Sequence, residues 1–162
     1  ADDTLTALRT GAAHIGVLPL TTIPANMTAE KLADVGQMLV LPEAHPLAQK
    51  PRLTLEDLAG VALIVPPPGT AQRRTLDSVF LNAGVSWEIA VEARGWPLAI
   101  HLVKLGTGLS IVNDFCHLPA GLVGKPLDGL PSHTYYAVRT NDTPFEGAAE
   151  RVWKRLIGGR RH

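Results

Sequence analysis

Residues 87–114 read WEIAVEARGWPLAIHLVKLGTGLSIVND, and they form the most regular part of the chain. Residues 88–92 and 109–112 have the length and apolar content of short strands. The segment between them has helical spacing, so the predicted order is strand, loop, helix, tight turn, strand. A short helix that joins two apolar strands indicates a crossover unit of a parallel sheet.

The helix in this stretch is predicted over residues 98–105. Pro97 suits the first helical turn, where its missing N–H would have had no partner. Gly106 stands where a left-handed C-terminal cap is expected. His101 and Lys104 fall on the polar side, because the apolar residues repeat with helical spacing on the other side. The residues of that apolar face are Leu98, Ala99, Leu102, Val103 and Leu105.

The residues before this stretch complete a predicted doubly wound lobe. Residues 61–65 are uniformly apolar, as in a strand buried in a parallel sheet. A helix is expected over residues 70–83, with Thr70 as its N-cap and Gly84 after its end. Residues 61–112 therefore predict strand, helix, strand, helix, strand. The first of these helices is expected to bury Leu76, Val79, Phe80 and Ala83.

Shorter elements flank this lobe. The expected strands are residues 15–18, 36–41, 122–127 at a sheet edge and 134–139, and the expected helices are residues 4–9, 54–58 and 145–157. Asp3 or Thr4 would cap the first helix and Thr54 the second. Pro46 disfavours a helical His45, so a crossover strand is expected there. The last helix would bury Ala149, Val152, Trp153 and Leu156.

The composition is that of a soluble globular protein. Of 162 residues, 46% are hydrophobic and 19% are charged, which argues against a disordered chain. Basic and acidic residues balance at 15 each, so the chain is not expected to bind DNA or an anionic membrane by itself. The single cysteine, Cys116, excludes an internal disulfide and a cysteine-based metal site. No apolar run reaches the ~20 residues of a membrane helix, and we expect a reducing, cytoplasmic location.

Four motifs carry a resemblance to a known family. They are LRTGAAHIGV at residues 8–17, HPLA at 45–48, TLEDLAG at 54–60 and LVKLGTGLSIV at 102–112, the last preceded by the acidic Glu92. In these motifs the chain resembles the effector-binding domain of LysR-type transcriptional regulators, over nearly all of its length. His14 is a departure, since the family usually has an acidic residue at this position.

The resemblance implies an α/β protein with two doubly wound lobes, similar to type 2 periplasmic binding proteins. The second lobe would cover residues 44–133. The first would combine residues 1–43 with 134–162 and would be incomplete, as expected for a chain truncated before a winged helix-turn-helix and a first strand-helix-strand. The implied function is to bind a small-molecule effector between the lobes and to alter DNA binding by the separate domain. A homodimer or tetramer is implied as well.

The expected ligand site lies where strands end and helices begin. In open α/β sheets, ligands bind beyond the carboxyl ends of the strands, where helix N-termini offer unpaired N–H groups. The helix starts at 69–70 and 96–97 follow adjacent strands, so they should face one cleft that favours a small anion, most often a carboxylate. The candidate ligand-binding residues are Thr21, Thr22, Pro68, Gly69, Thr70, Arg73, Gly95, Trp96 and Asn113.

Each candidate also has a purely structural interpretation. Thr70 can be an ordinary helix cap, and Trp96 can serve packing between the lobes. Arg73 can be a solvated helix residue, and Thr21 and Thr22 can be ordinary polar residues of a loop. Asn113 can cap the turn that begins at Phe115.

Catalytic and metal-binding patterns are missing from the sequence. Residues 106–108 lack the third glycine of a dinucleotide fingerprint, and residues 107–110 do not form a G-x-S-x-G elbow. Cys116 and His117 are sequence neighbours, not a converging catalytic pair, and the six histidines lack metal-ligand spacing. We predict no cofactor, no metal and no enzymatic activity. Two other classes stay open: a solute-binding protein of a transporter, and a small enzyme that acts on a carboxylate.

Overall fold

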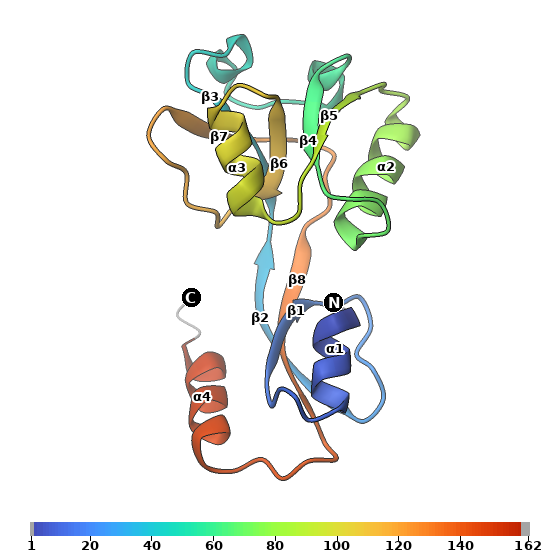
Figure 1. Cartoon of the computed structure of the whole chain (residues 1–162), viewed down its shortest axis with the longest axis vertical. Helices are drawn as coiled ribbons and strands as arrows, with labels where there is room; N and C mark the ends of the chain where they lie inside the picture. The colour runs from blue at the N-terminus through green and yellow to red at the C-terminus, as the bar shows by residue number, and fades with distance from the viewer. Residues whose placement is uncertain (1, 160–162) are drawn as a thin grey trace. The chain divides into compact units, whose positions relative to one another are not determined.

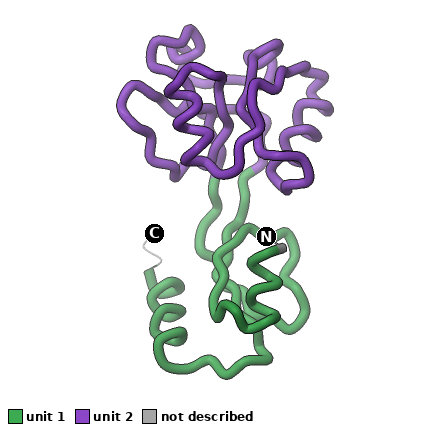
Figure 2. The backbone as a smooth tube through the Cα atoms, in the orientation of Figure 1, with its two compact units in different colours: residues 1–35, 132–162 green, residues 36–131 purple. Residues whose placement is uncertain are grey.

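The computed structural model describes residues 2–159, and these fall into two compact units (Figure 2). One unit combines the chain up to Val35 with the chain from Ser132 onward, and the other runs from Gly36 to Pro131. The sequence had placed the divisions at 43/44 and 133/134. The observed division lies earlier because the strand that follows Gly36 pairs with two strands of the second unit.

The second unit contains a five-stranded mixed sheet with the order β5-β4-β6-β3-β7 (Figure 1). β4 is parallel to both β5 and β6, whereas β3 is antiparallel to β6 and β7. The predicted succession of strand, helix, strand, helix, strand is confirmed, as is the edge position of β7. The bounds are β3 Gln37–Pro42, β4 Ala62–Val65, α2 Ala71–Ala83, β5 Glu88–Glu92, α3 Trp96–Lys104, β6 Leu109–Asn113 and β7 Leu122–Pro126.

Each face of this sheet packs on a different helix, because successive side chains of a strand point to opposite faces. In β4, Leu63 and Val65 join the core that contains Phe80 of α2. Ile64, between them, joins the core that contains Val103 of α3. The two helices thus cover opposite faces, and the carboxyl ends of the parallel strands lead into the starts of both helices.

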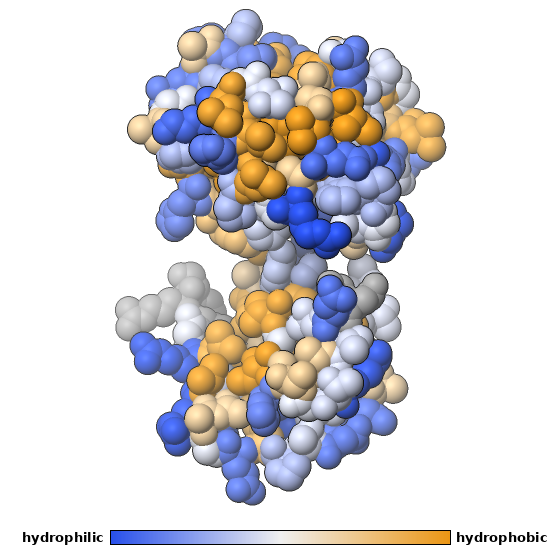
Figure 3. All heavy atoms as spheres, in the orientation of Figure 1, coloured by the Kyte–Doolittle hydropathy of each residue, from blue (hydrophilic) through white to orange (hydrophobic). Residues whose placement is uncertain are grey.

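The buried faces of the two helices differ in part from the prediction. α3 buries Ala99, Ile100 and Val103, while Leu98 and Leu105 are 49% and 66% exposed. The helix contacts the sheet through a stripe centred on Ile100, so both ends of the predicted apolar face turn to solvent. Figure 3 shows hydrophobic side chains gathered on the face of this unit where α3 lies. In α2, Leu76 and Phe80 are buried as predicted, Val79 is partly buried and Ala83 is exposed.

Two short 3-10 helices precede β4: η1 Pro46–Gln49 and η2 Leu55–Leu58. His45 is extended as predicted, but no crossover strand follows, because its Nδ1 accepts the Leu47 N–H at 3.2 Å and caps η1. Thr54 is confirmed as the N-cap residue of η2. The Asp57 carboxylate accepts the Thr54 N–H at 3.0 Å, which closes the start of this turn.

The first unit contains a three-stranded antiparallel sheet with the order β1-β8-β2. Its elements are α1 Asp2–Arg9, β1 Gly16–Pro19, β2 Met27–Val35, β8 His133–Thr140 and α4 Gly147–Gly158. β2 was missed from sequence because MTAEKLADV is rich in helix-forming residues. Its pairing along β8 makes this segment a strand, which shows tertiary context overriding local propensity.

Two further predictions for the first unit are corrected. α1 begins at Asp2, so Asp3 and Thr4 lie inside the helix and do not cap it. In α4, Trp153 is buried as predicted, but Val152 is 51% exposed because a single narrow stripe of this helix meets the sheet. No helix in the described part of the chain is long and apolar enough to cross a membrane.

Candidate functional site

A pocket of about 230 Å³ lies in the second unit, where the parallel strands β4 and β5 end beside the middle of β6. Its walls come from the end of β4 with residues 66–67, from the start of α2, from residues 93–96 and from the middle of β6. The lining is mostly apolar. Among the described residues that line it, Arg94 supplies the only charged side chain, and this side chain is exposed.

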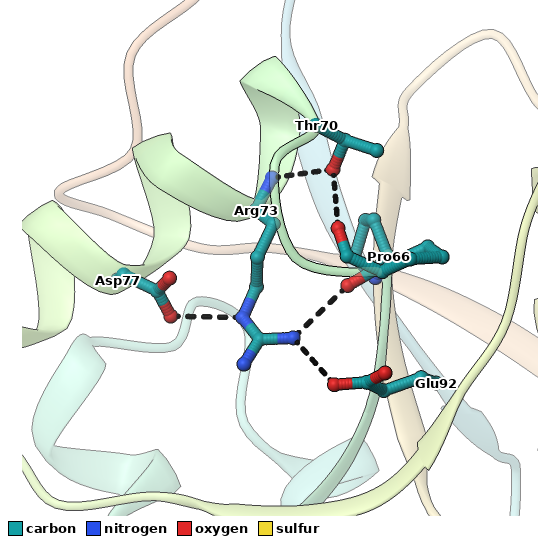
Figure 4. A network of polar contacts seen from close by, with 6 residues as sticks. Pro66, Thr70, Arg73, Asp77 and Glu92 are labelled. Carbon is teal, nitrogen blue, oxygen red and sulfur yellow. Dashed lines mark hydrogen bonds and ion pairs between the residues drawn. The ribbon is translucent and has the colours of Figure 1, made fainter.

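The start of α2 is capped by Thr70. Its Oγ1 accepts the Arg73 N–H at 3.2 Å and donates to the Pro67 carbonyl oxygen at 2.9 Å (Figure 4). The N–H groups of Ala71 and Gln72 have no intrahelical acceptor, as at any helix start. The Gln72 side chain donates to the Ile111 carbonyl oxygen at 3.2 Å and so ties this first turn to the middle of β6.

Arg73 holds the wall behind the pocket together (Figure 4). Its side chain is 11% exposed, and its Nε lies 2.9 Å from Asp77 Oδ1. Its Nη1 donates to Glu92 Oε1 and to the Pro66 carbonyl oxygen, both at 3.1 Å. Burial by itself lowers the pKa of Arg73, but the hydrogen bonds to the two carboxylates outweigh it and raise the pKa. The interpretation of Arg73 as a solvated residue is therefore wrong.

The start of α3 is more open. Gly95 precedes the helix with a φ of +88°, and no side chain caps the first turn. Trp96 lines the pocket and meets the Phe115 ring edge to face, with 5.5 Å between the ring centroids. Arg94 has no hydrogen-bond or ion-pair partner among the described residues. An unpaired guanidinium therefore stands beside a helix start that its own chain leaves uncapped.

The structure brings some of the predicted site residues together. Thr70, Gly95 and Trp96 line the pocket, as the two adjacent helix starts had suggested. Pro68, Gly69 and Arg73 belong to the same segment but do not line it. Asn113 is 2% exposed, and its carbonyl oxygen accepts the Cys116 N–H at 3.1 Å, which fits its alternative role in the turn. The remaining candidates, Thr21 and Thr22, lie exposed in the first unit.

Three polar residues that line the pocket were not among the predicted site residues. Arg94 lies in the loop after β5, where a ligand was expected, and its charge was the available signal. Gln72 and Ser110 carried no such signal. Ser110 is buried in β6, and its Oγ donates to the Ile64 carbonyl oxygen at 3.1 Å, so it joins two strands.

Comparison with protein families gives one model that covers almost the whole chain, the LysR substrate binding domain, which matches residues 1–159. The transcriptional activator protein LysR of Escherichia coli K12 is 30% identical over 148 residues, which is 90% of this chain and 48% of that protein. The HTH-type regulator YybE of Bacillus subtilis is 33% identical over 95 residues, which is 59% of this chain and 32% of that protein. The chain thus spans half or less of these curated relatives.

Solved structures share the fold at low sequence identity. The CcmR regulatory domain of Synechocystis PCC6803, in complex with 2-PG, has a TM-score of 0.82 and 14% identity, over 97% of this chain and 78% of that one. The QuiR effector-binding domain with shikimate has a TM-score of 0.77 and 15% identity, over 97% and 76%. The BenM effector-binding domain with benzoate has a TM-score of 0.76 and 22% identity, over 98% and 74%.

Proposed function

The chain belongs to the family of LysR substrate-binding domains, and from this premise we propose that it is the effector-sensing part of a LysR-type transcriptional regulator. DNA would be bound by a separate winged helix-turn-helix domain in the cytoplasm, and the sensing parts would associate as a homodimer or tetramer. The family match favours this function over the solute-binding protein of a transporter. The curated relatives are named as regulators, which also argues against an enzyme.

The effector that we propose is a small carboxylate bound in the pocket at the ends of β4 and β5. The observation that carries this is the meeting, at one apolar pocket, of two helix starts and of Arg94, which has no partner among residues 2–159. Helix N-termini favour anions, and a guanidinium matches the two oxygens of a carboxylate. Ile64, Trp96 and Ala99 offer a surface for a short aliphatic or aromatic body. A role for Thr21 and Thr22 stays a prediction.

Coupling to DNA binding would use a population shift, in which the effector favours one of two arrangements of the protein. A hydrogen-bonded link supports this. The Asp114 carboxylate accepts the Gly36 N–H at 3.0 Å, and the Asp114 N–H donates to the Gly36 carbonyl oxygen at 3.1 Å. Gly36 is the first residue of the second unit, and Ile111, three residues before Asp114, lines the pocket. A change at the pocket thus has a short route to the junction, along the chain from Ile111 to Asp114 and then through two hydrogen bonds to Gly36.

A thermal-shift screen against aliphatic and aromatic carboxylates tests the proposal. At 100 times its dissociation constant, a ligand stabilises the fold by about 2.7 kcal/mol, which raises Tm by several degrees. Arg94→Gln should weaken the affinity of a hit by about tenfold or more, because a charge-assisted hydrogen bond is lost. The control Arg151→Gln removes an exposed arginine of α4 and should leave the affinity unchanged. Equal binding by the Arg94 variant, or by the neutral amide of the hit, would contradict the proposal.

A further inference from the structure

The pocket at the ends of β4 and β5 has different polar groups on its two sides. Arg94 follows β5, whereas Ser110 and Ile111 belong to β6. β4 lies between these two strands in the sheet, so the sides are about 10 Å apart, which is two strand spacings. The Gln72 side chain belongs to the β6 side, because its Nε2 donates to the Ile111 carbonyl oxygen. A ligand that spans the pocket therefore meets a cation at one end and two neutral side chains at the other.

The Gln72 amide offers a hydrogen-bond acceptor to the pocket. A carbonyl oxygen can only accept, so the contact with Ile111 uses the amide nitrogen and leaves Oε1 over. Gln72 Oε1 has no hydrogen-bond partner among residues 2–159. Gln72 is half-buried, and its Oε1 is not cut off from solvent. A ligand in the pocket can therefore reach this oxygen.

Ser110 adds acceptor capacity on the same side. It is 2% exposed and lines the pocket, and its Oγ donates to the Ile64 carbonyl oxygen at 3.1 Å. A serine hydroxyl has one hydrogen and two lone pairs, so only lone pairs remain for a ligand. The β6 side of the pocket therefore requires a ligand group that donates a hydrogen bond.

An alcohol fits this side better than an ammonium group does. Arg94 is the only charged side chain among the described lining residues, and the two helix starts add partial positive charge. Glu92, which precedes the lining residue Ala93, already binds Arg73. A ligand ammonium group would thus be desolvated without a carboxylate partner from the pocket lining. An alcohol can also accept the second N–H of the Gln72 amide, which an ammonium group cannot do.

We infer that the effector is a hydroxy acid whose hydroxyl lies several atoms away from its carboxylate. This inference rests on the carboxylate site proposed above and names the second functional group of that ligand. The carboxylate would bind at Arg94, and the hydroxyl would donate to Gln72 Oε1, with Ser110 Oγ as the other acceptor of that side. A 2-hydroxy acid carries its hydroxyl too close to the carboxylate to reach the β6 side. The pocket volume of about 230 Å³ is below the roughly 300–1,000 Å³ of many ligand sites, so the ligand is compact.

Amide NMR titrations of the 162-residue chain with matched acids test this inference. The probes are butyrate, 2-hydroxybutyrate, 4-hydroxybutyrate and 4-aminobutyrate, together with benzoate and 4-hydroxybenzoate. Each 4-hydroxy acid should bind about three- to tenfold more tightly than its parent acid, which is the gain from one net hydrogen bond. The affinities for 2-hydroxybutyrate and 4-aminobutyrate should not exceed the affinity for butyrate. The amide shifts should centre on residues 66–72 and 93–95.

A substitution at Gln72 tests which side chain receives the hydroxyl. Gln72→Met keeps a side chain of similar length and removes the amide, so it should abolish the gain from the 4-hydroxyl. Gln49→Met, which changes an exposed glutamine of η1 outside the pocket, is the control and should preserve the gain. The gain is a ratio of two affinities in the same variant. A general loosening of the pocket, which lowers both affinities, therefore does not imitate the expected result.

Failure of this inference and failure of the proposed function give different results. If the parent acids bind and lose affinity in Arg94→Gln, but the 4-hydroxyl adds nothing, the carboxylate site stands and the hydroxy-acid inference is overturned. A gain that persists in Gln72→Met also overturns it, as does tighter binding of 4-aminobutyrate than of 4-hydroxybutyrate. If no acid binds at millimolar concentration, or if Arg94→Gln binds every acid equally well, the carboxylate site itself fails and the inference fails with it.

Discussion

The helices α2 and α3 both begin at the ends of parallel strands in one sheet, yet their first turns are built differently. At α2, the hydroxyl of Thr70 takes up one backbone N–H, and Arg73 binds two carboxylates and a carbonyl oxygen. At α3, Gly95 offers no side chain, and Pro97 removes one donor. The α2 start is thus partly satisfied by its own side-chain cap, whereas the α3 start has no side-chain cap, and the neighbouring Arg94 has no partner in the described structure.

This difference suggests that the two helix starts have different roles at the pocket. The polar groups of α2 rigidify a wall, because a buried guanidinium with three acceptors holds the end of β4, the end of β5 and α2 in one arrangement. At α3, the Arg94 side chain is exposed and the first helical turn has no side-chain cap. A ligand can therefore bind there without first breaking internal hydrogen bonds. Four substitutions test this comparison, taken from the largest expected effect on stability to the smallest.

Arg73→Ala should reduce the free energy of unfolding by about 2–4 kcal/mol, because Glu92, Asp77 and the Pro66 carbonyl oxygen lose their partner. The upper limit stays below that of a fully buried pair, since both carboxylates remain partly solvated. Urea unfolding measures this value. Arg74→Ala, at the next position of the same helix, removes an exposed side chain and should cost less than about 1 kcal/mol. Equal losses of unfolding free energy for the two variants would contradict the proposal that Arg73 holds the pocket wall together.

Gly95→Ala should cost about 1–3 kcal/mol, because a φ of +88° strains any residue with a Cβ. Space does not limit this substitution, since the new Cβ would meet only Pro97 Cδ, at 3.9 Å. Gly158→Ala, in α4 and with open space around its Cβ position, is the control and should be neutral or slightly stabilising. A Gly95 variant as stable as this control would show that the loop relaxes freely before α3.

Thr70→Val should destabilise the chain by about 1 kcal/mol, because the Arg73 N–H loses its acceptor and the Pro67 carbonyl oxygen loses its donor. Thr70→Ser keeps the hydroxyl and should recover most of this loss. Thermal unfolding of the three proteins gives the comparison. If Ser and Val are equally destabilising, the methyl group of Thr70 matters and the cap does not.

Arg94→Gln should change the free energy of unfolding by less than about 0.5 kcal/mol, because the side chain is exposed and has no partner in the described structure. The same variant is expected to lose carboxylate affinity, so a single substitution separates stability from binding. A loss of stability as large as that of Arg73→Ala would mean that both helix starts are built by internal contacts.

Much of the second unit could be predicted because its signals are local. Residues 61–65 and 109–112 are apolar over strand lengths, and Gly84 and Gly106 mark helix ends with positive φ. β2 could not be predicted, because its residues favour a helix and become a strand only through the ladder with β8. In α3 and α4, some apolar residues that were predicted to be buried are exposed, for a related reason. Helical spacing identifies an apolar face, but the width of the neighbouring element decides how much of it is covered.

For the site, local sequence was sufficient to place two helix starts beside each other, because parallel strands that are neighbours in a sheet end at the same edge. Thr70, Gly95 and Trp96, which these helix starts indicate, line the pocket. The sequence does not indicate which polar groups already have partners, since Arg73 and Glu92 are 19 residues apart and meet only in the folded chain. Tertiary packing alone decided that Arg73 supports the wall and that Arg94 has no partner within the described part of the chain. The physical reason is that hydrogen bonds between distant residues depend on distances that no local pattern encodes.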